Sequence, residues 1–221
     1  MYITLIFLCG GVGSRMQSSL PKQYLPLGEH PLFLHGLTPF LQEKRILHAV
    51  FVTHPEKKPL FPQHFPHSFA LPGARRQDSV CSAIAKMPAP TTHILVHDGA
   101  RPFIDLATIA RLIDIGSNED AAALAMPVAS TIRQVGPDHF TEALIERSTL
   151  WEMQTPQMLR VDMARLGATR AEEKKITVTD DVALAELAGG RVRIVTGSDR
   201  NIKITTKADY LFAQYLHEKA V

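Results

Sequence analysis

The chain has 221 residues, enough for one well-buried domain, because single hydrophobic cores stop growing only beyond roughly 250 to 300 residues. Its 45% apolar and 21% charged residues are ordinary for globular proteins and argue against a disordered or fibrous chain. With 24 Lys and Arg against 22 Asp and Glu, the formal net charge of +2 gives no general case for binding nucleic acid or an anionic membrane. We therefore expect a single domain over residues 1–221.

The apolar runs, such as residues 2–8 and 121–126, are strand-sized and far shorter than the roughly 20 residues of a membrane helix. The first run has no basic region before it and leads into a glycine-rich loop, so it predicts a buried strand rather than a signal peptide. Cys9 and Cys81 have neither the spacing of metal ligands nor the number of a disulfide framework. We expect both to be packing residues and the protein to be cytoplasmic.

Short apolar runs alternate with segments of helical pattern along the chain. The predicted strands are residues 2–8, 49–53, 93–97, 121–126 and 192–195. The predicted helices are residues 31–42, 78–86, 106–115, 161–166, 180–187 and 208–218. This alternation predicts an α/β fold with a Rossmann-like, mostly parallel sheet flanked by helices, and ligands at the carboxyl ends of its strands.

Residues 131–157 interrupt the alternation. They mix polar and charged residues, contain the turn pair Gly136 and Pro137, and have little helical periodicity. We expect an excursion from the sheet in the form of a protruding β-arm.

Three glycines follow the first predicted strand in CGGVGSRM, and PKQY comes shortly after. Glycines let backbone N–H groups approach a phosphate chain closely, and Arg15 and Lys22 would add cations. The glycines are Gly10, Gly11 and Gly13. The segment predicts a triphosphate cradle, whereas a purely structural turn with two surface charges is the alternative.

These two segments resemble the signature loop of the sugar-phosphate nucleotidyltransferases. PKQ is similar in particular to the cytidylyltransferases of the methylerythritol phosphate and ribitol phosphate type. The resemblance implies that the loop wraps the triphosphate of CTP and that Arg15 and Lys22 are catalytic, stabilising charge on the phosphates.

HDGARP, residues 97–102, ends the third predicted strand. A carboxylate at a strand end, followed by a small-residue turn and an arginine, could hold a divalent cation and a phosphate side by side. The motif resembles the family's HDAARP, with Gly99 in place of alanine. The resemblance implies that Asp98 binds Mg²⁺, Gly99 contacts the nucleotide, and Arg101 positions the acceptor or its surroundings. A structural salt bridge is the alternative for Arg101, and we expect His97 to be a packing residue.

GARRQDS, residues 73–79, is a basic turn that opens a predicted helix. It resembles the family's cytosine- and ribose-recognising loop, which implies that Gly73 and Ser79 bind the nucleotide. Ala74 departs from the family, which often has a polar residue there. Asp78 or Ser79 could instead cap a helix that starts near Val80.

The arm resembles a family segment that reaches across a homodimer to grip the acceptor phosphate, through its R-x-x-L-W-x-x-x-TPQ pattern. The resemblance implies acceptor contacts from Thr131, Arg147 and Thr155. Ser130 and Glu146 replace the family's usual aspartates, which puts supporting hydrogen bonds in doubt.

Two motifs remain near the C-terminus. TDD, residues 179–181, opens a predicted helix and could be a charged N-cap. NIKIT, residues 201–205, resembles the family's NIKVT, which implies that the catalytic Lys203 lies at the α-phosphate.

Together the motifs predict a CTP-dependent cytidylyltransferase, a homodimer with shared sites. The acceptor phosphate attacks the α-phosphorus of CTP and pyrophosphate leaves, with Mg²⁺ and the cations stabilising the transition state. A methylerythritol phosphate acceptor, used in isoprenoid precursor synthesis by the non-mevalonate route, is preferred. Ribitol 5-phosphate cytidylyltransferase is the alternative, and a non-catalytic nucleotide-sensing module is a remote one. A Rossmann oxidoreductase is disfavoured, because the dinucleotide fingerprint is incomplete.

Overall fold

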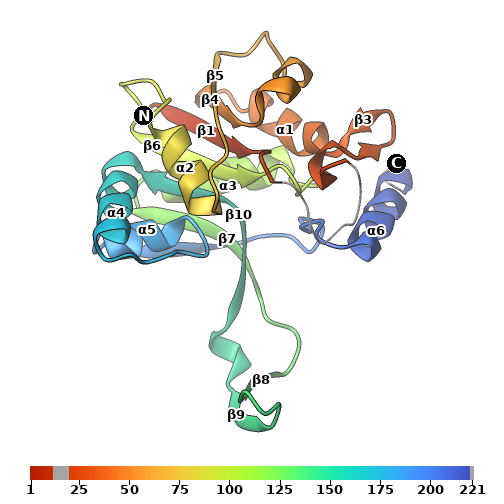
Figure 1. Cartoon of the computed structure of the whole chain (residues 1–221), viewed down its shortest axis with the longest axis vertical. Coiled ribbons are helices and arrows are strands. Elements are labelled where there is room, and N and C mark those ends of the chain that lie inside the picture. The colour runs from red at the N-terminus through yellow and green to blue at the C-terminus, as the bar shows by residue number, and fades with distance from the viewer. Residues whose placement is uncertain (12–19, 220–221) are drawn as a thin grey trace.

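The computed structural model describes residues 1–11 and 20–219. Its centre is a seven-stranded sheet in the order β11-β7-β10-β6-β1-β4-β5 (Figure 1). These strands are β1 (Ile3–Leu8), β4 (Ile46–Val52), β5 (His67–Ala70), β6 (His93–Asp98), β7 (Ala121–Pro127), β10 (Trp151–Arg160) and β11 (Val192–Thr196). Neighbouring strands are parallel except where β10 pairs antiparallel with both β6 and β7. The predicted mostly parallel α/β sheet is confirmed.

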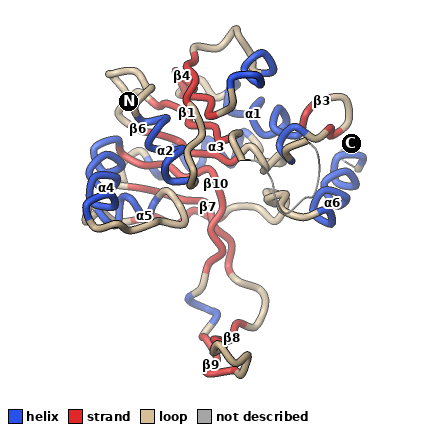
Figure 2. Tube along the Cα trace, in the orientation of Figure 1, coloured by secondary structure: helices blue, strands red, loops and turns tan. Residues whose placement is uncertain are grey.

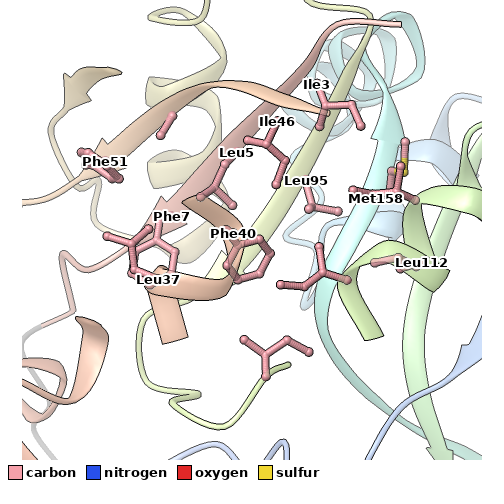
Figure 3. Close-up of a cluster of buried hydrophobic side chains, with 14 of the residues drawn as sticks. Ile3, Leu5, Phe7, Leu37, Phe40, Ile46, Phe51, Leu95, Leu112 and Met158 are labelled. Carbon is pink, nitrogen blue, oxygen red and sulfur yellow. The ribbon is translucent and has the colours of Figure 1, made fainter. Parts of the chain in front are cut away.

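Helices cover both faces of the sheet, and the central strand β1 therefore buries its alternate side chains on opposite sides. Leu5 and Phe7 join the core beneath two helices, shown in Figure 3, whereas Ile6 joins the core beneath three others. The first pair is α1 (Leu32–Gln42) and α3 (Leu106–Gly116). The other three are α2 (Arg76–Ile84), α4 (Val161–Glu173) and α5 (Val182–Leu187). A strand buried on both faces is continuously apolar, which is why the N-terminal run was recognisable.

The C-terminal helix α6 (Lys207–Glu218) lies apart from the two cores on the faces of the sheet and packs against a third, smaller core. That core includes Leu27 and Leu32, beside the short hairpin of β2 (Pro26–Leu27) and β3 (His30–Pro31). The N-terminal part of the chain also contains two short 3-10 helices, η2 (Lys22–Tyr24) and η3 (Pro55–Leu60). Every helix among residues 1–11 and 20–219 is too short or too polar to cross a membrane.

The structure differs from the predicted elements in three places. β5 and β10 were not expected as strands, because their sequences carry polar residues where a buried strand is normally apolar. α4 continues to Glu173, beyond the predicted end at residue 166. The prediction stopped early because the exposed, charged end of the helix has no apolar pattern. α2 begins at Arg76 rather than near Val80, and Asp78 lies within its first turn, where it accepts a hydrogen bond from the backbone of Arg75 at 3.0 Å.

The predicted β-arm is present but shorter than residues 131–157. β8 (Ile132–Val135) and β9 (Thr141–Ile145) form a hairpin that projects from the body, followed by η4 (Arg147–Thr149), as Figure 2 shows. From Trp151 onward the chain re-enters the central sheet as β10. The boundary at residue 157 was therefore wrong: Gln154, Thr155 and Gln157 of β10 are buried and bond to neighbouring segments, and sequence alone does not show those bonds.

Candidate functional site

A cavity of about 480 Å³ lies beyond the carboxyl ends of β1, β4 and β6. Parallel strands end at the same edge of a sheet, so segments far apart in the sequence meet there. Seven residues that the sequence singled out line it: Gly10, Gly11, Lys22, Gly73, Ser79, Asp98 and Lys203. Gly13 and Arg15 lie outside the described residues.

Asp98 ends β6 and is the anionic centre of the cavity. Its side chain is nearly buried, with Lys203 Nζ 2.6 Å from Oδ2 and Arg76 Nη2 3.0 Å from Oδ1. Burial alone would raise the pKa of Asp98, but Arg76 and Lys203 hold it well below its usual value. The carboxylate is therefore ionised at neutral pH.

Lys203 is held at the cavity by anchors on either side of it. Asn201 is fully buried and donates through Nδ2 to the carbonyl of Thr155 at 2.8 Å. Ile204 is also fully buried, and its backbone nitrogen donates to the carbonyl of Ala100 at 2.9 Å. The NIKIT segment thus places one cation beside Asp98 while its neighbours fill the interior.

The described start of the glycine loop, up to Gly11, is held by side chains that the sequence did not assign to this task. Gln23 Nε2 donates to the carbonyls of Cys9 and Gly11, each at 2.7 Å, and Tyr24 donates to the carbonyl of Cys9 at 2.9 Å. His54, from the end of β4, donates to the carbonyl of Gly10 at 3.2 Å. The PKQY motif therefore contributes more than Lys22, and its glutamine and tyrosine were the available signal.

The turn before α2 closes on itself. The backbone nitrogen of Gly73 donates to Ser79 Oγ at 3.0 Å, and a Cβ at Gly73 would lie 2.3 Å from the Cβ of Asp78. The turn has no room for a side chain at Gly73, so Gly73 and Ser79 present a compact wall to the cavity. Asp78 takes the helix-capping role that the sequence left open.

A directed chain of hydrogen bonds supports Asp98 from behind. The backbone nitrogen of Asp98 donates to Thr155 Oγ1 at 3.2 Å, and that hydroxyl donates to His97 Nδ1 at 3.1 Å. His97 Nε2 then donates to the carbonyl of Arg101 at 3.2 Å. Burial lowers the pKa of His97 to about 3, which keeps the ring neutral, and it packs between Phe7 and Phe40. His97 is a packing residue, as expected.

Three other predicted residues are not in the described cavity wall. Thr155 is buried behind Asp98, whereas acceptor contact was expected. Arg101 is also buried and donates to the carbonyl of Asn201 at 2.6 Å, so its described contact is with the backbone rather than the salt bridge named as its alternative. Gly99 packs on the sulfur of Cys9 rather than lining the cavity, because the backbones are too close for a side chain there.

Thr131 and Arg147 lie on the arm. They line a separate hollow of about 300 Å³ with Leu144, Ile145 and Glu146. Arg147 Nη1 donates to the carbonyl of Ala129 at 2.6 Å. The arm leaves the body at the end of β7 and projects away from it, as Figure 1 shows, and the hollow on the arm shares no described lining residue with the cavity, so a single chain keeps these two residues outside the cavity wall.

Two further residues, both charged, were missed by the sequence reasoning. Arg76 lines the cavity and reaches both Asp98 and the buried Asp181, whose Oδ1 is 2.5 Å from Arg76 Nη1. The signals were the second arginine of GARRQDS and the last aspartate of TDD. Neither motif reveals by itself that its residue faces the other, 105 positions away.

The chain resembles known proteins in both sequence and structure. A family model described as 2-C-methyl-D-erythritol 4-phosphate cytidylyltransferase matches residues 3–219. The chloroplastic enzyme of that name from Oryza sativa subsp. japonica is 38% identical, over 97% of this chain and 74% of that protein. The one from Chlamydia pneumoniae is also 38% identical, over 96% of this chain and 98% of that protein.

Solved structures agree with these relatives. The 2-C-methyl-D-erythritol 4-phosphate cytidylyltransferase from Thermus thermophilus is 26% identical, with a TM-score of 0.82 over 99% of this chain and 100% of that chain. The 4-diphosphocytidyl-2C-methyl-D-erythritol synthase from Anaerococcus prevotii, 21% identical, shares the fold with a TM-score of 0.87 over 99% of both chains. The chain thus belongs to the 2-C-methyl-D-erythritol 4-phosphate cytidylyltransferase family.

Proposed function

We propose that this protein transfers CMP from CTP to 2-C-methyl-D-erythritol 4-phosphate and releases pyrophosphate, a step of isoprenoid precursor synthesis by the non-mevalonate route. Membership of the family supports the reaction. The observation that carries it is the meeting of Lys22, Asp98 and Lys203 in one cavity, beside Gly10 and Gly73. These residues come from distant segments, and their chemistry suits a nucleoside triphosphate.

The reaction forms a bond from an acceptor phosphate oxygen to the α-phosphorus and breaks the bond from that phosphorus to the pyrophosphate oxygen. A phosphate monoester is already ionised at neutral pH, so no general base is needed. Lys22 and Lys203 supply positive charge where negative charge spreads in the transition state. The glycine backbone allows the triphosphate to approach closely.

Mg²⁺ is proposed as the metal, held by Asp98. The described residues contain no cluster of three or more His, Cys, Asp or Glu side chains that could cage an ion by themselves. This fits Mg²⁺ that arrives with the nucleotide, because Mg²⁺ commonly uses one or two carboxylates plus phosphate oxygens. When bound, the ion would neutralise phosphate charge, and Asp98 is ionised and faces the cavity.

We also propose that two chains form a homodimer with shared sites, in which Thr131 and Arg147 serve the partner's cavity. The arm carries three exposed apolar residues, namely Val135, Phe140 and Leu144. Phe140 is 74% exposed, and an apolar surface of this kind on a projecting hairpin is typical of an interaction site. A closed two-fold dimer would cover this apolar surface on both of its arms.

A cytoplasmic location is proposed as well. Both cysteines, Cys9 and Cys81, are free thiols, which suits a reducing compartment.

The decisive test is an assay of purified protein with CTP and Mg²⁺, following pyrophosphate release with methylerythritol phosphate or ribitol 5-phosphate as acceptor. We expect pyrophosphate to be released with methylerythritol phosphate, and mass spectrometry should detect the CDP-linked product of that acceptor. If pyrophosphate is released with ribitol 5-phosphate and not with methylerythritol phosphate, ribitol 5-phosphate is the acceptor. Binding of CTP without release from either acceptor would favour the nucleotide-sensing alternative.

A further inference from the structure

Arg76 is shared between two carboxylates in different ways. Its Nη1 and Nη2 reach the two oxygens of Asp181 at 2.5 and 2.7 Å. Its Nε and Nη2 both converge on a single oxygen of Asp98, at 3.1 and 3.0 Å. The paired, shorter contact is the stronger geometry for a guanidinium. Asp181 is therefore the main anchor of Arg76, and Asp98 receives the weaker contact.

Asp181 itself is fixed from the opposite direction. It is only 2% exposed, and its backbone nitrogen donates to Gln157 Oε1 at 2.8 Å. The same oxygen accepts from Val182 at 3.1 Å, so the fully buried Gln157 caps the start of α5. Asp181 is not among the described residues of the cavity wall, and its link to the cavity runs through Arg76.

The four groups form a balanced set of charges. Arg76 holds Oδ1 of Asp98 and Lys203 holds Oδ2, so the direction of that carboxylate is set by two cations. Asp181 draws Arg76 toward itself at 2.5 Å, and Arg76 counteracts the rise that burial causes in the pKa of Asp181. If Asp181 lost its charge, Arg76 would be left with Asp98 as its only carboxylate partner among the described ion pairs.

We propose that Arg76 and Asp181 are a positioning pair for Asp98, in which the buried Asp181 offsets part of the positive charge that Arg76 places beside Asp98. Asp98 then keeps its charge for the divalent cation that enters with CTP. This rests on the proposed function, and it assigns to Arg76 and Asp181 no contact with the reacting atoms. The pair tunes how strongly metal and nucleotide help each other bind.

The test measures CTP binding by calorimetry without acceptor, so that no transfer occurs, once in Mg²⁺ and once in EDTA. The ratio of the two dissociation constants is the metal factor. We expect Asp181→Asn to lower this factor about tenfold, the size typical for partners of a metal ligand. CTP affinity in EDTA should stay equal or tighten, because the site has gained net positive charge.

Arg76→Met should do the opposite. It removes a cation beside Asp98, so we expect a larger metal factor and weaker CTP binding in EDTA. The double variant removes both partners and restores the charge balance, which should return the factor to within about threefold of wild type. Because removing one partner of a buried pair is strongly destabilising, Asp181→Asn could fail to fold. Arg76→Met removes a partner of the same pair, so whichever single variant folds is compared with the double variant, and that comparison decides the proposal.

Asp180→Asn is the matched control. Asp180 is the neighbouring carboxylate and accepts from the backbone of Ala183 at 3.3 Å, whereas its described contacts do not include Arg76. We expect its metal factor to equal that of wild type. An unchanged factor in Asp181→Asn, or shifts of the same sign in Asp181→Asn and Arg76→Met, would overturn the positioning pair alone. A wild-type chain that does not bind CTP would overturn the proposed function and this inference with it.

Discussion

The sulfur of Cys9 occupies the space that an alanine side chain at position 99 would need. A Cβ built on Gly99 would lie 2.3 Å from Cys9 Sγ and 3.0 Å from the carbonyl oxygen of Leu8. The related motif HDAARP has alanine where this chain has Gly99. Cys9 and Gly99 thus share one tightly filled space next to Asp98.

Gly99→Ala should therefore destabilise the protein by about 1 to 3 kcal/mol, the usual cost of overpacking a tight interior. Adding Cys9→Ala removes the sulfur and should recover more than half of that loss, because the remaining contact with Leu8 is looser. Denaturant unfolding of the two single variants and the double variant measures the coupling. Additive losses in the double variant would contradict the assignment of Cys9 as the obstacle.

Lys22→Ala and Lys203→Ala should each lower kcat roughly a hundredfold or more, since each deletes a preorganised charge at the transition state. The same loss is expected from the family resemblance for Arg15→Ala. Lys207→Ala is the control, because Lys207 is exposed at the start of α6 and should leave kcat unchanged. Rates within about twofold of wild type in Lys203→Ala would remove Lys203 from the mechanism.

Activity should require a divalent cation, and Asp98→Asn should increase the Mg²⁺ concentration needed for half-maximal rate by at least about tenfold. A neutral amide is a poor ligand for Mg²⁺, and the substitution also deprives Arg76 and Lys203 of their shared carboxylate. The measurement is the initial rate against Mg²⁺ at saturating CTP. Full activity in a chelator would contradict the metal assignment.

His97 makes stability sensitive to acid. Burial lowers its pKa from 6.5 to about 3, while in the unfolded chain the ring takes up a proton near pH 6.5. Stability from this group is therefore fully present above about pH 6.5 and is lost as the pH falls toward about 3. Between pH 7 and 5 the free energy of unfolding should fall by about 2 kcal/mol, from about 1.4 kcal/mol per pKa unit.

The check on His97 is denaturant unfolding at pH 7, 6 and 5. His97→Gln should be less stable at pH 7 but should lose this part of the pH dependence. His64→Gln, at an exposed histidine, should keep the wild-type slope. An equal slope in His97→Gln and wild type would show that acid acts elsewhere.

Shared sites can be tested by mixing Arg147→Ala with Lys22→Ala chains. If Arg147 serves the partner's cavity, each heterodimer has one site with both residues intact, and activity should return to at most about half of wild type. Verified heterodimers with no recovered activity would rule out the shared site. A fully active monomer at the assay concentration would do the same, and neither result would touch the cytidylyltransferase assignment.

Much of the fold and part of the cavity wall could be predicted from the amino-acid sequence. Strands buried on both faces are continuously apolar, so β1 and β6 are visible as short runs, and parallel strands must deliver their ends to one edge. Gly10 follows β1 and Asp98 ends β6, which is why their meeting in one cavity was predictable, whereas Lys22 was recognised only from the PKQY resemblance.

The roles of β10 and of the charges behind the cavity were decided only in three dimensions. Thr155 and Gln157 look like polar loop residues in the sequence, yet they are buried, bonding respectively to the backbones of Asp98 and Asp181. Arg76 meets Asp181 across 105 positions of sequence. Hydrogen bonds between distant segments leave no local periodicity, so residue type and spacing could mark these positions as polar but not say which partners would satisfy them.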